Sequence, residues 1–306
     1  MIDVHQHLWP SALIDALRER DEPPRLRGWV LELPGEADHV VDPRDHDPYD
    51  RAALAVADGL ELALVSLSSA LGVETLPPGE ADELLAAYHE GALTLPWPFG
   101  AWAAAGLTEP DAAALERRLD EGFVGLALPA SALLDAAGYA HAAPLLEVLE
   151  ERGRPLFIHP GPAGGQPAAA PAWWPALVPY VAQMHAAWFA FRVHGRPAHP
   201  GLRVCFALLA GLGPLHGERL AARGGGRSPV DPDVFLDVSS YGTRAIDSIV
   251  RVLGVDVLVN GSDRPYAAPI VPELGAAVLS ALGRSNPIRL LDAGEVINVL
   301  DVPTRA

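Results

Sequence analysis

Two histidines near the start of the chain are spaced so that both can bind one metal ion. His5 and His7 lie in the apolar run Met-Ile-Asp-Val-His-Gln-His. Side chains two residues apart on a β-strand point to the same side. A strand over residues 1–7 therefore directs both imidazoles to one point, with Asp3 behind them on the same face. Two such imidazoles are half of a metal site, although two polar histidines at a strand end have the same spacing.

Two further candidate ligands follow other apolar runs. His159 ends the run Arg-Pro-Leu-Phe-Ile-His, and Asp263 follows Val-Asp-Val-Leu-Val-Asn-Gly-Ser. Three neutral imidazoles and one carboxylate can hold a single divalent ion and leave a position for water. Taken separately, Asp263 could cap a helix and His159 could be a core histidine with a backbone partner. Their joint position at strand ends favours the metal site.

The elements that must position these ligands alternate between strand and helix. Strand-like runs fall at 1–6, 61–67, 97–103, 123–128, 155–159, 202–208, 233–238 and 256–261, with helical patterns between them. Eight such units predict a (β/α)8 TIM barrel, in which the ends of strands one, five and eight converge over one mouth. An open doubly wound sheet is the alternative, and the absence of a Gly-rich phosphate loop after the first strand disfavours it.

Two segments interrupt this alternation. Residues 21–49 are rich in Pro, Asp and Gly, and they predict a small hairpin insertion after the first strand, built from 28–33 and 38–41. Residues 160–174 follow the fifth strand. Both segments come after strand ends on the face where barrel enzymes build their active sites. No internal repeat or second domain is evident, so we expect one barrel domain over residues 1–306.

Composition limits the function classes. The formal net charge of −17 opposes binding to nucleic acid or to an anionic membrane. No signal peptide and no membrane-spanning apolar stretch is visible. The single cysteine, Cys205, excludes an internal disulfide and fits a cytoplasmic protein. All 22 basic residues are arginine, so the chain has no Schiff-base lysine and no carboxylated lysine to bridge two metal ions.

These motifs resemble the amidohydrolase superfamily, in particular the group that includes aminocarboxymuconate-semialdehyde decarboxylase and small lactonases. The matching segments are Asp3-Val-His-Gln-His-Leu-Trp-Pro, Gly122-Phe-Val-Gly-Leu, Pro155-Leu-Phe-Ile-His-Pro, Leu202-Arg-Val, Asp237-Val-Ser, Gly261-Ser-Asp-Arg-Pro and Asn286-Pro-Ile-Arg-Leu-Leu. The resemblance implies a distorted (β/α)8 barrel with one metal ion, usually zinc, with manganese as the alternative. His5, His7, His159 and Asp263 match the ligand positions. Family members often pair, so we expect a homodimer, with the apolar helix at 175–194 as a candidate interface.

The chain departs from the family at the sixth strand. By alignment, Leu208 stands where the family has a histidine that polarises substrate or handles a proton. Leucine can do neither. His216, at the turn into the next helix, is a candidate catalytic replacement; the alternative is an exposed helix histidine.

Several residues of the expected mouth loops are candidates for substrate binding. Arg264 could clamp a substrate carboxylate, or it could form a structural ion pair with a loop aspartate. Trp9, Trp173, Trp174 and Tyr241 could stack on a flat substrate.

Three functions are compatible with this sequence. The first is a metal-dependent hydrolase of a small amide, ester or lactone, in which the ion activates water and Asp263 transfers its proton. The second is a metal-dependent, non-oxidative decarboxylase of a small aromatic or unsaturated acid, which needs a new proton donor in place of Leu208. The third is a degenerate barrel that binds metal with little turnover.

Overall fold

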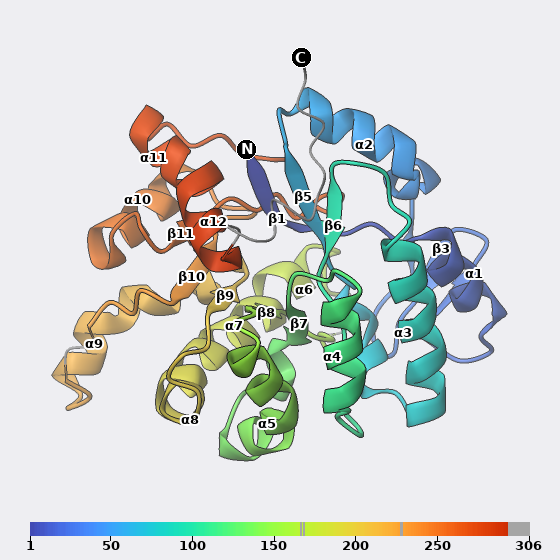
Figure 1. The fold of residues 1–306 in the computed structure, drawn as a ribbon, viewed down its shortest axis with the longest axis horizontal. Helices are drawn as coiled ribbons and strands as arrows, with labels where there is room; N and C mark the ends of the chain where they lie inside the picture. Colours follow the sequence, from blue (N-terminus) through green and yellow to red (C-terminus); the bar gives the residue numbers. More distant parts are fainter. Residues whose placement is uncertain (166, 168, 227–228, 293–306) are drawn as a thin grey trace.

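Parallel strands form the centre of the molecule (Figure 1). The computed structural model describes residues 1–165, 167, 169–226 and 229–292. Its parallel strands are β1 (Ile2–Gln6), β5 (Leu62–Val65), β6 (Phe99–Ala101), β7 (Leu126–Pro129), β8 (Leu156–His159), β9 (Val204–Phe206), β10 (Val234–Asp237) and β11 (Leu258–Val259). They form two sheets, in the orders β1-β5-β6 and β11-β10-β9-β8-β7.

Backbone hydrogen bonds join the two sheets at both of their edges. At one seam the Ala103 amide donates to the Gly125 carbonyl at 2.8 Å. At the other, the Val4 amide donates to the Asn260 carbonyl at 2.9 Å. The strands therefore close into a barrel, and the predicted fold class is confirmed. Because the seams lie outside the regular ladders, the barrel is irregular at these two places.

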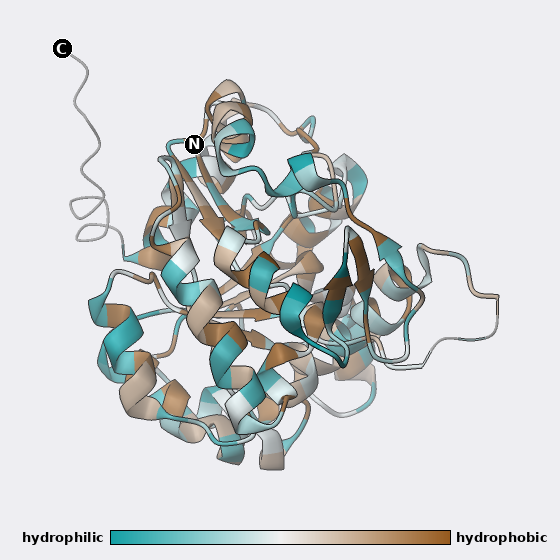
Figure 2. Ribbon diagram, turned by 90° about the vertical axis from the view of Figure 1, so that its right-hand side faces the viewer, coloured by the Kyte–Doolittle hydropathy of each residue, from teal (hydrophilic) through white to brown (hydrophobic). Residues whose placement is uncertain are grey.

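The strands of the barrel are short, and almost all of their residues are buried. Every residue of β1, β5, β7, β8, β9, β10 and β11 is buried. Strands buried on both faces need apolar residues at successive positions, which is why their sequences lack alternation. Figure 2 shows apolar strand residues inside and hydrophilic stretches along the outer helices.

Helices surround the barrel (Figure 1). They are α1 (Ser11–Glu19), α2 (Pro48–Ala57), α3 (Pro78–Ala92), α4 (Ala112–Asp120), α5 (Ala136–Glu151), α6 (Trp174–Leu177), α7 (Pro179–Ala190), α8 (Arg196–Ala198), α9 (Gly217–Ala222), α10 (Thr243–Leu253), α11 (Ala276–Ser280) and α12 (Asn286–Leu291). None of the described helices has the length and apolarity needed to cross a lipid bilayer.

The insertion after β1 has one strand more than predicted. It is an antiparallel sheet of β2 (Arg25–Arg27), β3 (Val30–Glu32) and β4 (His39–Val40). The extra strand, Arg-Leu-Arg, is too polar to be recognised from its sequence. Its central Leu26 is nevertheless buried, and Arg25 pairs with Glu32 across the strands at 2.7 Å.

The chain leaves β9 through a left-handed turn that the sequence pattern did not predict. Residues 208–212 all have positive φ, between 48° and 59°. Residues with a Cβ lose about 1–2 kcal/mol each in this conformation. Burial of Leu209 and Ala210 and contact with α7 offset this cost. A Cβ on Gly211 would lie 2.4 Å from the Val181 carbonyl oxygen.

Replacing Gly211 with alanine therefore tests how tightly this turn is held. We expect Gly211→Ala to lower the free energy of unfolding by more than about 2 kcal/mol, because the clash is with backbone. Gly217→Ala is the matched control: Gly217 begins α9 with helical φ, and a Cβ there would meet nothing within 4 Å. It should stabilise by about 0.5–1 kcal/mol. Urea unfolding of both variants measures the difference; equal stabilities would contradict a tightly packed turn.

A buried carboxyl group lies in the loop after β5. Glu74 is 1% exposed, and its Oε1 accepts a hydrogen bond of 2.7 Å from the Ser69 hydroxyl. Its Oε2 has no partner among the described residues. Burial raises the pKa of Glu74 to about 7, so the folded protein keeps this proton where the unfolded chain has lost it.

This difference predicts a pH dependence of stability. Between its unfolded value of 4.5 and about 7, the folded state binds the proton more tightly, so the contribution of Glu74 to stability falls as pH rises. Glu74→Gln, which stays neutral, should gain stability relative to the native chain between pH 5 and pH 8. Urea unfolding across this range measures the gain. Exposed Glu90→Gln is the control, and a pH-independent difference for Glu74→Gln would refute the assignment.

Candidate metal centre

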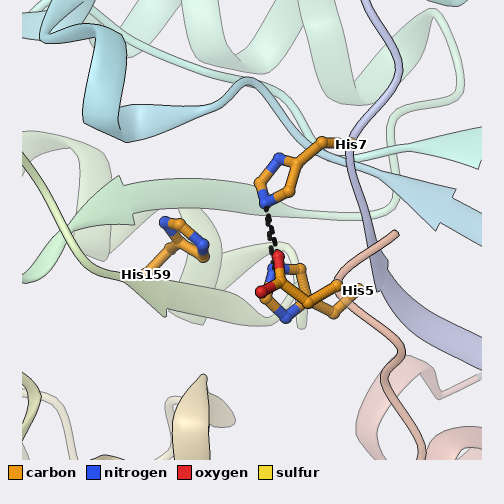
Figure 3. Close-up of side chains that lie close together, drawn as sticks. His5, His7 and His159 are labelled. Atoms are coloured by element: carbon orange, nitrogen blue, oxygen red, sulfur yellow. Dashed lines mark hydrogen bonds and ion pairs between the residues drawn. The ribbon is translucent and has the colours of Figure 1, made fainter. Parts of the chain in front are cut away.

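Four side chains from three distant segments converge at the carboxyl end of the barrel. His5 and His7 come from β1 and the residue that follows it, His159 ends β8 and Asp263 follows β11. One potential ligand atom of each lies within 4.8 Å of those of the others. The His5 and His7 Nε2 atoms are 3.1 Å apart, and Asp263 Oδ1 lies 3.4 and 3.3 Å from them. Figure 3 shows the three imidazoles converging. The structure thus brings together the four predicted ligands.

The hydrogen bonds of the three imidazoles decide which nitrogens face the centre. His5 Nδ1 lies 2.5 Å from Asp237 Oδ2, His7 Nδ1 3.2 Å from the Ser66 carbonyl oxygen, and His159 Nδ1 2.9 Å from the Pro160 carbonyl oxygen. These oxygens can only accept, so each Nδ1 carries the proton and donates it. Each Nε2 then faces the centre; the neutral His7 and His159 present lone pairs there, and His5 presents one when a cation replaces the second proton that its raised pKa retains. Converging lone pairs and a carboxylate oxygen fit a bound cation.

Asp237 also belongs to this site. It begins the motif Asp237-Val-Ser, but the sequence alone assigned it no role. It ends β10, 232 residues away from its partner His5. Its Oδ2 also accepts from the Ser239 hydroxyl at 2.7 Å, and its Oδ1 accepts from the Ser239 amide at 2.7 Å. These bonds fix the carboxylate, which in turn fixes the orientation of the His5 ring. An aspartate at the end of the seventh apolar run was the available indication.

Asp3 lies behind the cluster but does not belong to it. Its Oδ1 accepts from the amides of His5 and Ser262, and its Oδ2 accepts from Gln6 Nε2 at 2.8 Å. These contacts connect β1 to the segment that carries Asp263. Asp3 therefore holds two ligand-bearing segments together.

The charges around the cluster favour a cation. Burial lowers the pKa of His7 and of His159, so both are neutral ligands. Burial also disfavours a charged His5, but the carboxylates of Asp237 and Asp263 outweigh it and raise the pKa of His5 to about 9. The carboxylates of Asp237 and Asp263 thus favour positive charge at the centre of the cluster.

The cluster opens into a pocket of about 450 Å³. His7, His159 and Asp263 line its base. Its walls come from Trp9, from the insertion after β1, from α6 and α7, and from the loops after β9, β10 and β11. Leu208 lines this pocket at the place that the family alignment indicated. The wall above the metal ligands is therefore apolar at this position.

The predicted substrate-binding residues divide into two groups. Trp9 and Tyr241 line the pocket. Trp173 and Trp174 do not lie among the described residues that line it, and Trp173 is 56% exposed. Arg264 points elsewhere, with its Nη2 2.8 Å from Asp58 Oδ2, which is the structural ion pair considered as the alternative.

His216 is not placed at the centre. It is exposed, and its ring packs edge-on against His185 at 4.9 Å. The described residues that line the pocket do not include it. The left-handed turn after Leu208 carries the chain over α7, and this turn decides where His216 lies.

Sequence reasoning also missed pocket residues on the insertion and on α7. Glu36, His39 and His46 come from the insertion, and Tyr180 from α7. His46 Nδ1 accepts the Trp9 amide at 3.0 Å, and its ring stacks on the Trp9 indole at 4.2 Å. The position of the insertion after a strand end was the only sequence indication for these residues.

Solved structures match the chain over nearly its whole length. It is similar to IDCase from Metarhizium anisopliae at 18% identity and a TM-score of 0.76, covering 96% of this chain and 97% of that chain. A 5-carboxyvanillate decarboxylase from Novosphingobium aromaticivorans, complexed with manganese and 4-hydroxy-3-methoxy-5-nitrobenzoic acid, has 17% identity and a TM-score of 0.72, with 95% of each chain covered. A 2,6-dihydroxybenzoate decarboxylase from Rhizobium has 17% identity and a TM-score of 0.67, covering 96% of this chain and 98% of that chain. No protein-family model and no curated protein matches the chain.

These similarities confirm the predicted barrel fold, which the chain shares with these solved structures. They also correct the hydrolase prediction, because the neighbours are decarboxylases and support the alternative reading instead. The physical reason for the error is that both reactions use the same ligand set. Three histidines and an aspartate identify a cation site, but they do not specify which substrate bond breaks.

The role of Asp237 can be tested through metal binding. Asp237→Asn keeps the shape but removes the charge behind His5, and we expect metal affinity to fall about 10–100-fold. His7→Ala, which removes a ligand, should reduce bound metal from about one equivalent to a small fraction. Competition with a chelator followed by elemental analysis measures both. Asp247→Asn is the control, because Asp247 on α10 pairs with Arg251 and does not line the pocket; native affinity in Asp237→Asn would refute the assignment.

Proposed function

We propose that this chain is a metal-dependent, non-oxidative decarboxylase of a small aromatic or unsaturated carboxylic acid. The observation that carries the proposal is the convergence of three imidazole lone pairs and the Asp263 carboxylate at the base of an aromatic-walled pocket. The fold shared with several aromatic-acid decarboxylases supports this reaction over others.

His5, His7, His159 and Asp263 would hold one divalent ion. A bound ion supplies positive charge that fixes the substrate carboxylate and stabilises the negative charge left when carbon dioxide departs. Zinc and manganese both accept imidazole and carboxylate ligands. The manganese in a structural neighbour supports considering manganese alongside the zinc expected from the family resemblance.

The pocket walls orient a flat substrate above this base. Trp9 is held by its indole N–H, which donates to the Ser68 hydroxyl at 3.1 Å, and by stacking on His46. Tyr241 and Tyr266 line the same pocket. Tyr241 and Tyr266 offer apolar faces to a planar acid, and the buried Trp9 supports this wall. Leu208 adds an apolar surface and excludes water where the family has a polar side chain.

Decarboxylation needs a proton to replace the lost carboxylate, and we assign its transfer to Asp263. The bond between the ring carbon and the carboxylate breaks, carbon dioxide leaves, and the electron pair stays on the carbon. Asp263 takes a proton from substrate or solvent and gives it to that carbon, forming a C–H bond. No histidine at position 208 is then required.

The remaining expectations are also part of this proposal. They are a single barrel domain over residues 1–306, a cytoplasmic location and a homodimer. The helix at 175–194 is the candidate interface of the homodimer. Its Trp188 is 5% exposed and packs against Phe206, so this side chain contributes little surface to an interface. Light scattering measures the oligomeric state.

The reaction is tested by product analysis in heavy water. The purified protein, loaded with manganese or zinc, should convert one or more 2-hydroxybenzoic or unsaturated acids to carbon dioxide and the corresponding compound with one deuterium at the former carboxyl position. Asp263→Asn should reduce kcat by at least about 100-fold. The control is Asp247→Asn, whose side chain is not among those that line the pocket. Full metal occupancy without carbon dioxide release from any acid would refute the proposal and favour a barrel that binds metal with little turnover.

A further inference from the structure

The insertion after β1 supplies a carboxylate to the wall of the pocket. Glu36 lies in the turn between β3 and β4 and lines the pocket with its side chain only 2% exposed. Its Oε1 accepts the Ala163 amide at 3.2 Å, and its Oε2 lies 3.8 Å from His39 Nε2. Neither contact is a close ion pair with arginine, so the carboxylate retains acceptor capacity.

Two loops from opposite parts of the barrel meet at Glu36. Gly35 has φ of 75°, and a Cβ there would be 3.6 Å from the carbonyl carbon of Gly164. The bond from Ala163 holds the turn of the insertion against the loop after β8. The Glu36 carboxylate is therefore a built part of the wall and does not extend freely into solvent.

Carboxylates outnumber cationic groups along this pocket, although Asp42 pairs with the exposed Arg44 at 2.7 Å and His39 lies beside Glu36. Asp42, Asp45 and Asp263 line it together with Glu36. No arginine is among the described residues that line it, and the chain has no lysine. Two guanidinium groups near the barrel mouth are engaged elsewhere, because Arg51 donates to the His7 carbonyl and to Gln6 Oε1, and Arg264 pairs with Asp58.

We infer that Glu36 makes the pocket select acids that carry a neutral or cationic hydrogen-bond donor, such as an amino or hydroxyl group, and reject acids with a second carboxylate. This inference rests on the proposed function, because the first carboxylate is assigned to the metal centre. A second carboxylate would lie unpaired beside the buried carboxylate of Glu36, which is costly. A donor would instead satisfy the free acceptor positions of Glu36.

The experiment compares two pairs of acids that differ in one substituent. The probes are 4-amino- and 4-carboxy-2-hydroxybenzoic acid, and the corresponding 5-substituted pair. Quenching of tryptophan fluorescence measures their dissociation constants, because Trp9 lines the pocket, and carbon dioxide release is measured separately. The native protein, with and without added manganese, should bind the better amino compound at least about tenfold more tightly than its carboxy counterpart.

Three variants identify the group responsible. Glu36→Gln should reduce the preference about tenfold, mainly by tighter binding of the carboxy compound. His39→Gln removes the imidazole beside Glu36 and should leave the preference unchanged or larger. Glu32→Gln is the matched control, since Glu32 lies on β3 of the same sheet, pairs with Arg25 and does not line the pocket; it should behave as the native protein.

The two proposals fail in different ways. A Glu36-dependent preference in binding without carbon dioxide release would support the recognition inference and refute the decarboxylase. Carbon dioxide release with equal or better use of the carboxy compounds, unchanged in Glu36→Gln, would overturn the inference and leave the decarboxylase standing. Absence of binding by all four compounds would also overturn the inference.

Discussion

Burial of negative charge at the carboxyl end of the barrel is the constraint on which this structure depends. The carboxylates of Asp3, Asp237 and Asp263 lie close to one another around the two histidines of the first strand segment. Such a group is stable only when hydrogen bonds and a positive charge compensate it. The His5 Nδ1 donor, the Ser239 donors and the backbone amides of His5 and Ser262 provide the hydrogen bonds, and the convergent Nε2 atoms leave one place for a cation.

The same constraint explains the division of labour among the strand ends. The β1 segment supplies two candidate ligands, β8 and the segment after β11 supply one each, and β10 supplies the carboxylate that orients His5. Asp3 joins β1 to the Asp263 segment by accepting the Ser262 amide. A barrel brings these ends together because its strands are parallel and closed, so the ligands need no flexible loop to reach one another.

The wall above the cluster distinguishes this pocket. Leu208 begins a left-handed turn and presents an apolar side chain, while the insertion after β1 adds acidic and imidazole groups on the outer side. The four clustered side chains therefore fit many metal-dependent reactions, and the wall is the part of the pocket in which this chain departs from the family pattern. This separation is also why the ligand set alone led to the hydrolase prediction, which the decarboxylase neighbours correct.

The sequence by itself determined the barrel and the four clustered side chains. Apolar runs of strand length alternate with helices, and His-X-His on a strand places two imidazoles on one side. The strand pattern and the His-X-His pair depend on local spacing, whereas the meeting of His159 and Asp263 with that pair follows from closure of the barrel. The contact of Asp237 with His5, the ion pair of Arg264 with Asp58, the displacement of His216 and the entry of Glu36 into the pocket were decided only by tertiary structure. Each depends on backbone directions in loops and on partners as far as 232 residues away, and no local periodicity encodes either.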